Sequence, residues 1–192
     1  MNREEIGRLQ KKIGVTVDYF WGPKSIAACQ KHLRALMPSP NPWPKSDQRS
    51  LTAFYGNAGD ESKLVNLDVS GLGVKYGGKT VRTVRCHQKV ASSLHRVFTE
   101  LSKFPAGQEA LTEYAGCYNN RPMRGGSLPS LHARGAAVDL SPDTNANKQF
   151  WPVSATMPIE VFECFAREGW LSAGAFWSRD AMHHEATQPS TR

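Results

Sequence analysis

The apolar positions between residues 2 and 37 repeat with a helical period. Asn2 is suited to cap a first helix, and Gly14 is suited to end it. Gly22-Pro23 marks a turn, and Pro23 fits the first position of a second helix. The pattern therefore predicts a small helical unit. The apolar positions that carry it are Ile6, Leu9, Ile13, Ile26, Cys29, Leu33 and Leu36.

A proline-rich stretch follows this unit. Residues 38–47 hold four prolines, and proline removes backbone donors and blocks helix formation. An extended, semi-stiff linker is the natural interpretation of such a stretch. We therefore predict a helical domain over residues 1–37, a linker over residues 38–47 and a second domain over residues 48–192.

The second domain mixes helical and strand patterns. Apolar positions that alternate steps of three and four predict one long helix over Lys79–Phe104. A further helix is predicted over Ile159–Glu168, ended by Gly169. Helices beside a small, mostly antiparallel sheet predict the α+β class. The short strands expected in that sheet are Leu111–Tyr118, Ala136–Leu140 and Met182–Thr187.

Composition narrows the class of partner without selecting one. The chain has 192 residues and a net charge of +7, which favours polyanions such as nucleic acid, anionic lipid or an acidic wall polymer. Lys and Arg are scattered, so the basic clusters of a nucleic-acid-binding protein are missing. No stretch is long and apolar enough to span a bilayer. The N-terminus has no apolar signal region, so we expect synthesis in the cytoplasm without a signal peptide.

The four cysteines do not indicate a metal site. They are widely separated and form no C-x2-C pair, which argues against a cysteine zinc knuckle. Buried free thiols, made in a reducing compartment, are the expected state. Cys117 could be drawn as the nucleophile of a cysteine peptidase with His132, but no family signature surrounds it.

Histidine and carboxylate side chains gather in two segments of the second domain. His132 precedes Asp139 by seven positions, and His183 and His184 follow about forty positions later, close to Asp180. Zinc accepts imidazole and carboxylate ligands, and catalytic sites use three protein ligands. A bound zinc lowers the pKa of water from about 15.7 to about 7. The spacing thus indicates a candidate zinc site, with one of the paired histidines as third ligand, although ordinary core or surface histidines remain the alternative.

At these residues the sequence resembles the zinc DD-peptidases. That family includes D-alanyl-D-alanine carboxypeptidases and dipeptidases and the L-alanyl-D-glutamate peptidases of phage endolysins. Its signature, S-x-H-x6-D followed by D/E-x2-H, stands here as Ser130 and His132, then Asp139, then Asp180 and His183. The resemblance implies that His132, Asp139 and His183 bind Zn²⁺ and that Asp180 is the catalytic base.

The same resemblance assigns expectations to neighbouring residues. The family uses an arginine upstream of the first histidine to hold the substrate and the developing oxyanion. Arg121 stands at that position, and Arg124 is the second candidate. Ser130 matches a serine that contacts substrate, although it could equally cap a turn. His184 replaces the usual phenylalanine, and Glu185 could orient a ligand or be solvated.

The N-terminal segment resembles the three-helix peptidoglycan-binding domain. The residues that match are Leu9-Gln10, Ile13-Gly14-Val15, the run from Asp18 to Ser25, and Ala28 followed by His32-Leu33; Tyr19 replaces a usual glycine and Trp21 a usual phenylalanine. The resemblance implies a small three-helix domain that binds the wall. Tyr19, Phe20 and Trp21 could form a stacking platform there, and the alternative is that at least one of them fills the small core.

Together these features predict a zinc-dependent peptidoglycan peptidase with a wall-binding domain. We expect a monomeric phage endolysin that cleaves a bond of the stem peptide or crosslink after release from the host cytoplasm. One alternative is a D-alanyl-D-alanine carboxypeptidase that releases terminal D-Ala. Another is a zinc-containing wall-binding module without turnover. The expected partner is peptidoglycan, with no nucleic acid and no membrane span.

Overall fold

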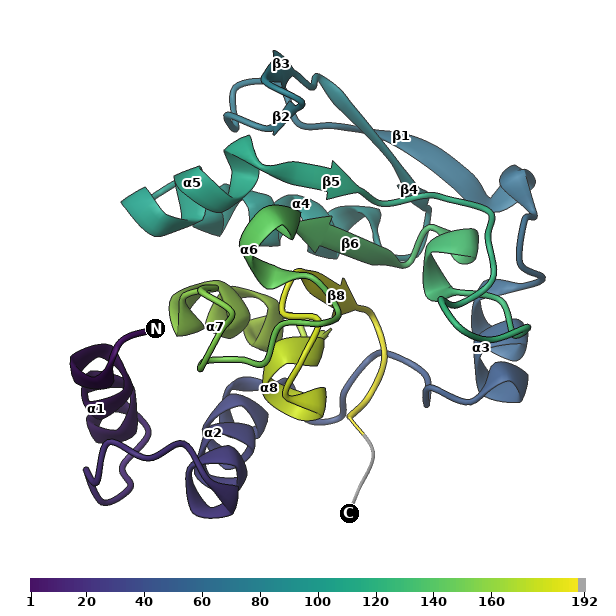
Figure 1. Ribbon diagram of the computed structural model, residues 1–192. Coiled ribbons are helices and arrows are strands. Elements are labelled where there is room, and N and C mark those ends of the chain that lie inside the picture. Colours follow the sequence, from purple (N-terminus) through teal and green to yellow (C-terminus); the bar gives the residue numbers. More distant parts are fainter. Residues whose placement is uncertain (190–192) are drawn as a thin grey trace.

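A four-stranded antiparallel sheet lies at the centre of the molecule (Figure 1). The computed structural model describes residues 1–189. The strand order is β5-β6-β8-β7, so Asp139 and His183, two of the three predicted metal ligands, lie on the two inner strands. The strands are β5 (Tyr114–Gly116), β6 (Ala137–Leu140), β8 (His183–Glu185) and β7 (Leu171–Ser172).

Helices pack beside this sheet and form a hydrophobic core with it. The predicted second-domain helix is confirmed as α7 (Ile159–Arg167), and Gly169 lies just beyond its end with φ 80°. Almost every residue of α7 is buried, because it packs between the sheet and other helices. These neighbours are α4 (Ala91–Leu101), α5 (Pro105–Thr112) and α2 (Pro23–Leu36). The short helices α6 (Pro142–Asn145) and α8 (Ala173–Trp177) follow β6 and β7. The α+β class is confirmed.

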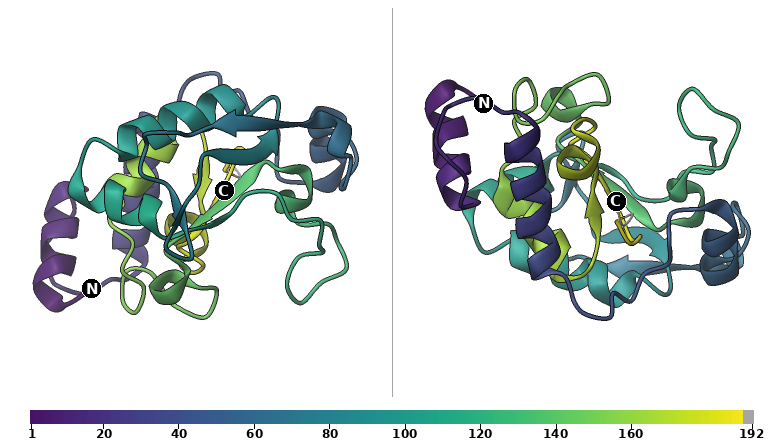
Figure 2. Two further views of the ribbon diagram at one scale, coloured as in Figure 1. Left: turned by 90° about the horizontal axis from the view of Figure 1, so that it is seen from above. Right: turned by 90° about the horizontal axis from the view of Figure 1, so that it is seen from below.

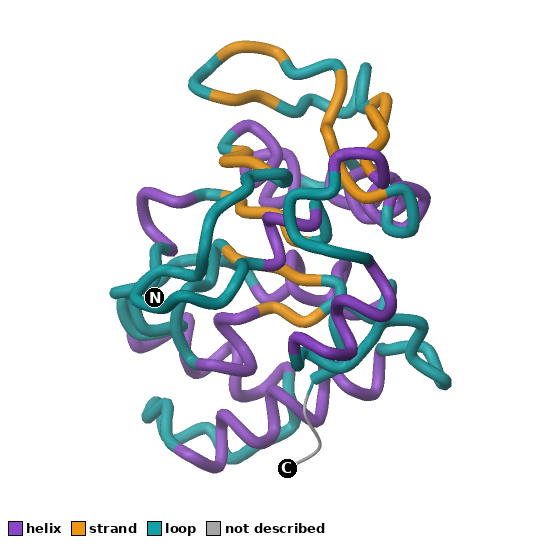
Figure 3. Tube along the Cα trace, turned by 90° about the vertical axis from the view of Figure 1, so that its right-hand side faces the viewer, coloured by secondary structure: helices purple, strands orange, loops and turns teal. Residues whose placement is uncertain are grey.

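Two further strand pairs lie at the opposite end of the molecule from the N-terminal helices (Figure 3). β1 (Leu64–Asp68) pairs with β4 (Thr83–His87), and β2 (Lys75–Tyr76) pairs with β3 (Lys79–Thr80), both antiparallel. α3 (Gln48–Tyr55) and the 3₁₀ helix η1 (Glu61–Lys63) precede them.

The predicted helix over Lys79–Phe104 is wrong in its first part. Residues 79–87 form β3 and β4, and the helix begins only at Ala91. Val84 and Cys86 are buried while Thr83 and Arg85 are exposed, which is the two-residue alternation of a strand. The apolar positions of a strand and of a helix coincide over so short a run. The predicted strand Leu111–Tyr118 is also shorter than expected, because α5 extends to Thr112.

Both predicted N-terminal helices are present. α1 (Arg3–Lys12) begins at an Asn2 capping box, and α2 starts with Pro23. Residues 1–37 hold these two helices rather than three. α2 packs against α7 and α8 (Figure 2), and Leu33 joins the same buried core as the sheet. α1 is linked to α7 by the ion pair of Lys12 with Glu160.

The proline-rich segment, residues 38–47, contains no helix and is anchored to the rest of the fold. The Trp43 indole nitrogen donates to the Glu168 carbonyl at 2.7 Å, and the Asn41 side chain donates to the Gly169 carbonyl at 2.9 Å. Trp43 is buried against Trp170. Among residues 1–189, no helix has the length and apolar character needed to cross a bilayer.

Candidate metal centre

A tight turn brings His132 to the central sheet. Ser130 caps the 3₁₀ helix η2 (Leu131–Arg134), and its hydroxyl accepts from the His132 backbone nitrogen at 3.3 Å. Gly135 ends η2 in the left-handed region with φ 64°. A Cβ at that position would lie 2.9 Å from the His87 backbone nitrogen, so the turn requires glycine. The chain then enters β6 directly.

Strand register places the other two residues of the site side by side. Asp139 of β6 is the direct antiparallel partner of His183 of β8. Side chains of directly paired residues project from the same face of a sheet. Alternation along β8 puts His183 and Glu185 on that face and His184 on the other.

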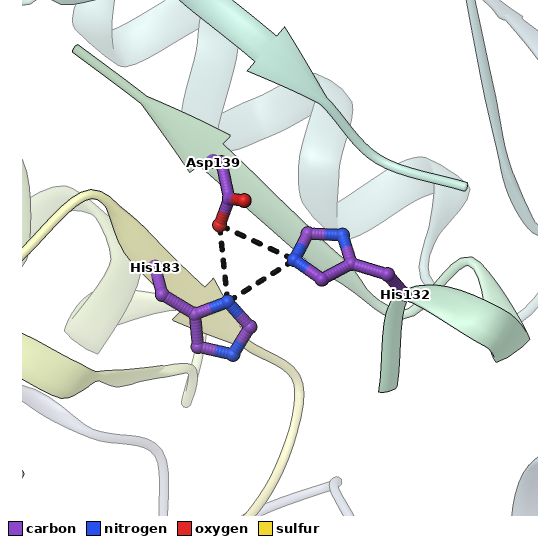
Figure 4. Close-up of side chains that lie close together, drawn as sticks. All are labelled: His132, Asp139 and His183. Atoms are coloured by element: carbon purple, nitrogen blue, oxygen red, sulfur yellow. Dashed lines mark hydrogen bonds and ion pairs between the residues drawn. The ribbon is translucent and has the colours of Figure 1, made fainter. Parts of the chain in front are cut away.

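His132, Asp139 and His183 form a compact triangle of possible ligand atoms (Figure 4). His132 Nε2 lies 3.2 Å from Asp139 Oδ1 and 3.1 Å from His183 Nδ1. The third edge, from His183 Nδ1 to Asp139 Oδ1, is 3.0 Å. Donor atoms of a tetrahedral zinc site lie about 3.3–3.4 Å apart, given bonds of about 2.0–2.1 Å. The two nitrogens and one oxygen therefore fit a small divalent cation.

The remaining ring nitrogen of each histidine has a partner that leaves the inward nitrogen free to bind a metal. His132 Nδ1 donates to the Cys117 carbonyl at 2.7 Å. His183 Nε2 donates to Glu185 Oε2 at 3.2 Å, and the Thr187 hydroxyl donates to Glu185 Oε1 at 2.6 Å. Such partners fix the tautomer and the ring orientation. Glu185 is therefore buried beside a candidate ligand rather than solvated.

The electrostatics of the triangle also favour a cation. Burial alone raises the pKa of Asp139, but hydrogen bonds from His132 and His183 outweigh burial and lower it below its ordinary value. Burial lowers the pKa of His183, whereas the Asp139 and Glu185 carboxylates raise it to about 10. The carboxylates thus attract positive charge to this point, whether a proton or a metal carries it.

Asp180 lies in the same pocket without being part of the triangle. Its Oδ1 is buried and has no hydrogen-bond partner among residues 1–189. Burial raises its pKa above the ordinary value. The backbone of Asp180 is held at φ 58°, an unusual conformation for a residue other than glycine. A buried carboxylate oxygen without a partner is poised to accept a proton.

Arg121, Arg124 and Ser130 line this pocket beside the candidate ligands. In residues 1–189 the Arg121 guanidinium makes one hydrogen bond, from Nη1 to the Pro122 carbonyl at 3.2 Å. Ser130 is buried and caps η2. The structure thus brings all the predicted site residues to one cleft, and their individual roles stay predictions.

His184 faces away from the pocket. Its ring stacks on Phe165 with centroids 3.9 Å apart, and its Nδ1 shares a hydrogen bond of 2.9 Å with Ser172 Oγ. Burial lowers its pKa to about 3. His184 thus fills an aromatic position of the core, which suits the phenylalanine found in the similar family.

The roles of two tryptophans near the last motif, Trp170 and Trp177, are not apparent from the sequence. Trp177 is 45% exposed and stacks on His183 with centroids 5.9 Å apart, so it walls the cleft. Trp170 is fully buried in the core. No local pattern separates these two roles. The hydrogen bond from His132 to the Cys117 carbonyl cannot be predicted from the sequence, because every residue has a backbone carbonyl.

Comparison with known proteins agrees with this geometry. Residues 124–186, about a third of the chain, match a family model described as D-alanyl-D-alanine carboxypeptidase. No curated protein and no solved structure matches the chain. The matched segment contains all three candidate ligands and Asp180. Together with the triangle, the match confirms the prediction that the chain is a zinc metallopeptidase.

Proposed function

We propose that this protein is a zinc-dependent endopeptidase that hydrolyses an amide bond within the peptides of peptidoglycan. The observation that carries the proposal is a cleft that continues past the triangle of ligand atoms on both sides. A substrate chain can then extend in both directions from the reacting bond. A carboxypeptidase needs room on one side and only a short, closed site on the other.

The two halves of the cleft lie over different strands. On the β8 side, the pocket is walled by Trp177, Arg179 and Asp180. On the β5 side, a second pocket shares Arg121, His132 and Asp139 and continues past Tyr114 and Tyr118. A third hollow shares Tyr76, Tyr114 and Ala115 with the second and reaches α6.

The chain supplies the proton-transfer and charge-stabilising groups around the zinc site. When bound by His132, Asp139 and His183, zinc supplies a Lewis acid that polarises a carbonyl oxygen and acidifies water. Asp180 accepts the proton of the attacking water through Oδ1 and returns it to the leaving amine. Its raised pKa helps the first transfer, because burial disfavours the charged carboxylate and so makes it a stronger base toward the water proton.

Arg121 is proposed to stabilise the oxyanion that develops as water adds to the carbonyl. A guanidinium aimed at that oxygen acts mainly in the transition state. Ser130 is proposed to contact the substrate from the base of the pocket, in addition to capping η2.

A D-alanyl-D-alanine carboxypeptidase is the second candidate, because the matching family model carries that description. A wall-binding module without turnover is less well supported. Such a module needs no proton acceptor, yet Asp180 is held at the cleft with a buried oxygen that has no hydrogen-bond partner within residues 1–189.

The N-terminal helices are proposed to form the wall-binding part. Phe20 is 69% exposed and Tyr19 is 39% exposed, so both are accessible for stacking on a ligand. Trp21 instead packs edge-on against Trp151 with centroids 5.3 Å apart. The proposed platform therefore consists of Tyr19 and Phe20.

A phage endolysin is the proposed biological setting. In that role a monomeric chain is made in the host cytoplasm and reaches the wall through a membrane lesion. The net charge of +7 supports adhesion to an anionic wall polymer. Co-expression with a membrane-permeabilising holin should lyse the host, whereas expression of the enzyme alone should not.

Digestion of purified peptidoglycan tests the reaction. The zinc-loaded protein is incubated with wall material, with and without a chelator, and products are identified by mass spectrometry. Chelator-sensitive new L-Ala and D-Glu ends, or separated crosslinks, are the expected result. Release of D-alanine alone would establish the carboxypeptidase instead, and the absence of any product would contradict both.

A further inference from the structure

The pocket on the β5 side of the cleft contains cationic and aromatic side chains that the reaction itself does not require. Arg85 lies in β4, on the strand pair that the helical prediction missed. It reaches the same pocket as the candidate ligands His132 and Asp139. The aromatic walls of this pocket are Tyr76, Tyr114 and Tyr118, and it also contains Arg121, which is assigned to the reaction.

Arg85 is held in place by two groups from separate parts of the chain. Its Nη2 forms an ion pair with Glu61 of η1. Its guanidinium lies over the Tyr118 ring, with the central carbon 5.4 Å from the ring centroid. The Tyr118 hydroxyl donates to the other oxygen of Glu61 at 3.2 Å. The three side chains thus form a closed set that orients the guanidinium at the pocket wall.

This arrangement leaves most N–H donors of the Arg85 guanidinium available to bind a ligand. Within residues 1–189, Nη2 is the one Arg85 nitrogen with a hydrogen-bond partner, and a guanidinium carries five N–H donors. Glu61 is about half exposed, and an exposed ion pair stabilises a fold only weakly. The pair with Glu61 is therefore better explained as positioning Arg85 than as a contribution to stability.

The chemistry of the proposed substrates supplies a matching group. In an L-Ala–D-Glu bond, the carbon attached to the leaving nitrogen bears the free α-carboxylate of D-glutamate. In a D-Ala–diaminopimelate crosslink, that carbon also bears a free carboxylate. Hydrolysis at either bond therefore places an anion one carbon away from the reacting nitrogen, which is within the reach of a pocket that shares His132 and Asp139 with the metal site.

We propose that Arg85 forms a subsite for the carboxylate on the leaving residue. The inference rests on the proposed endopeptidase function. A carboxylate binds a guanidinium through two parallel N–H donors, which provides both attraction and orientation. Arg121, which lines both pockets, then remains free to act on the carbonyl oxygen. Arg85 makes the enzyme selective for stems in which this carboxylate is not amidated.

Paired substrates test the subsite. A stem peptide with D-glutamate is compared with the same peptide carrying D-isoglutamine, in which the carboxylate is an amide. If the wall digest shows crosslink cleavage, diaminopimelate and its amide form the pair. The wild-type protein should prefer the acid by about 10- to 100-fold in kcat/KM, since a charge-assisted contact is lost with the amide.

Arg85→Ala should reduce the ratio of kcat/KM for acid over amide to near one. Arg85→Lys should retain part of this preference, because lysine keeps the positive charge but lacks the planar guanidinium that binds a carboxylate through two donors. Arg82→Ala is the matched control, because Arg82 is an exposed arginine three positions away that does not line the pocket. It should keep the wild-type preference. An unchanged preference in Arg85→Ala, or its loss in Arg121→Ala alone, would overturn the proposal.

A binding measurement separates this inference from the proposed reaction. The product dipeptide γ-D-glutamyl-diaminopimelate and its α-amide are titrated into metal-free protein by calorimetry. Tighter binding of the acid, lost in Arg85→Ala, would support the subsite even if no peptide were hydrolysed. Equal binding of the acid and the amide would contradict the subsite even if the enzyme cleaved the wall.

Discussion

His183 and His184 are neighbours on β8, yet their side chains lie in opposite surroundings. His183 faces Asp139 and Glu185, and these carboxylates raise its pKa to about 10. His184 faces Phe165 in the core, and burial lowers its pKa to about 3. The same side chain type is thus made attractive to a cation on one face of the strand and kept neutral on the other. Strand alternation, rather than residue type, decides which histidine can serve the metal.

The largest effect is expected from His183→Ala. Loss of one of three ligands should remove the metal and reduce peptide hydrolysis to background. Metal analysis of purified protein, together with the wall digest, checks this. Retention of one equivalent of zinc would show that another group, such as His184, takes the third position.

Asp180→Ala should separate metal binding from turnover. The carboxylate is outside the triangle of ligand atoms, so zinc should be retained. Turnover should fall by about 10²- to 10⁴-fold, which is the usual contribution of a general base. Zinc content and kcat are measured on the same preparation. Loss of zinc would refute the assignment of Asp180 as base.

Glu185→Gln, on the same face of β8 as His183, should weaken zinc binding without abolishing it. The amide still reaches His183, but it no longer carries the charge that favours a cation there. Zinc affinity should weaken by about 10- to 100-fold, as for other partners of metal ligands. Competition with a chromophoric chelator measures the change. Thr187→Val, which removes the hydrogen bond that orients Glu185, should act in the same direction and less strongly.

His184→Phe should have the smallest effect. It removes a buried ring nitrogen, Nε2, that has no partner in residues 1–189, although it also leaves Ser172 Oγ without His184. These effects oppose each other, so the free energy of unfolding should change by about 1 kcal/mol or less. Zinc content should be unchanged. Denaturant unfolding and metal analysis check both, and a loss of zinc would mean that the two faces of β8 are not independent.

The sequence predicted the elements whose signals are local. The Asn2 cap, Pro23 and Gly169 mark helix ends by their own chemistry. The spacing of His132, Asp139 and the paired histidines indicated a candidate metal site, and the resemblance to the zinc DD-peptidases selected His183 as the third ligand. The strand β4 was missed because its pairing partner β1 lies about twenty residues earlier, and local periodicity contains no information on that partner. Arg85 was missed with it.

The packing of the N-terminal helices bears on how the enzyme would travel over its substrate. Lys12 pairs with Glu160 at 2.7 Å, and His32 pairs with Glu163 at 2.8 Å. α1 and α2 are thereby docked on α7, and Leu33 shares its core. A module joined by a loose tether lets its enzyme sweep the surrounding surface. Here the exposed Phe20 and the cleft are parts of one body, so each attachment would set both the distance and the direction of the bond presented for cleavage.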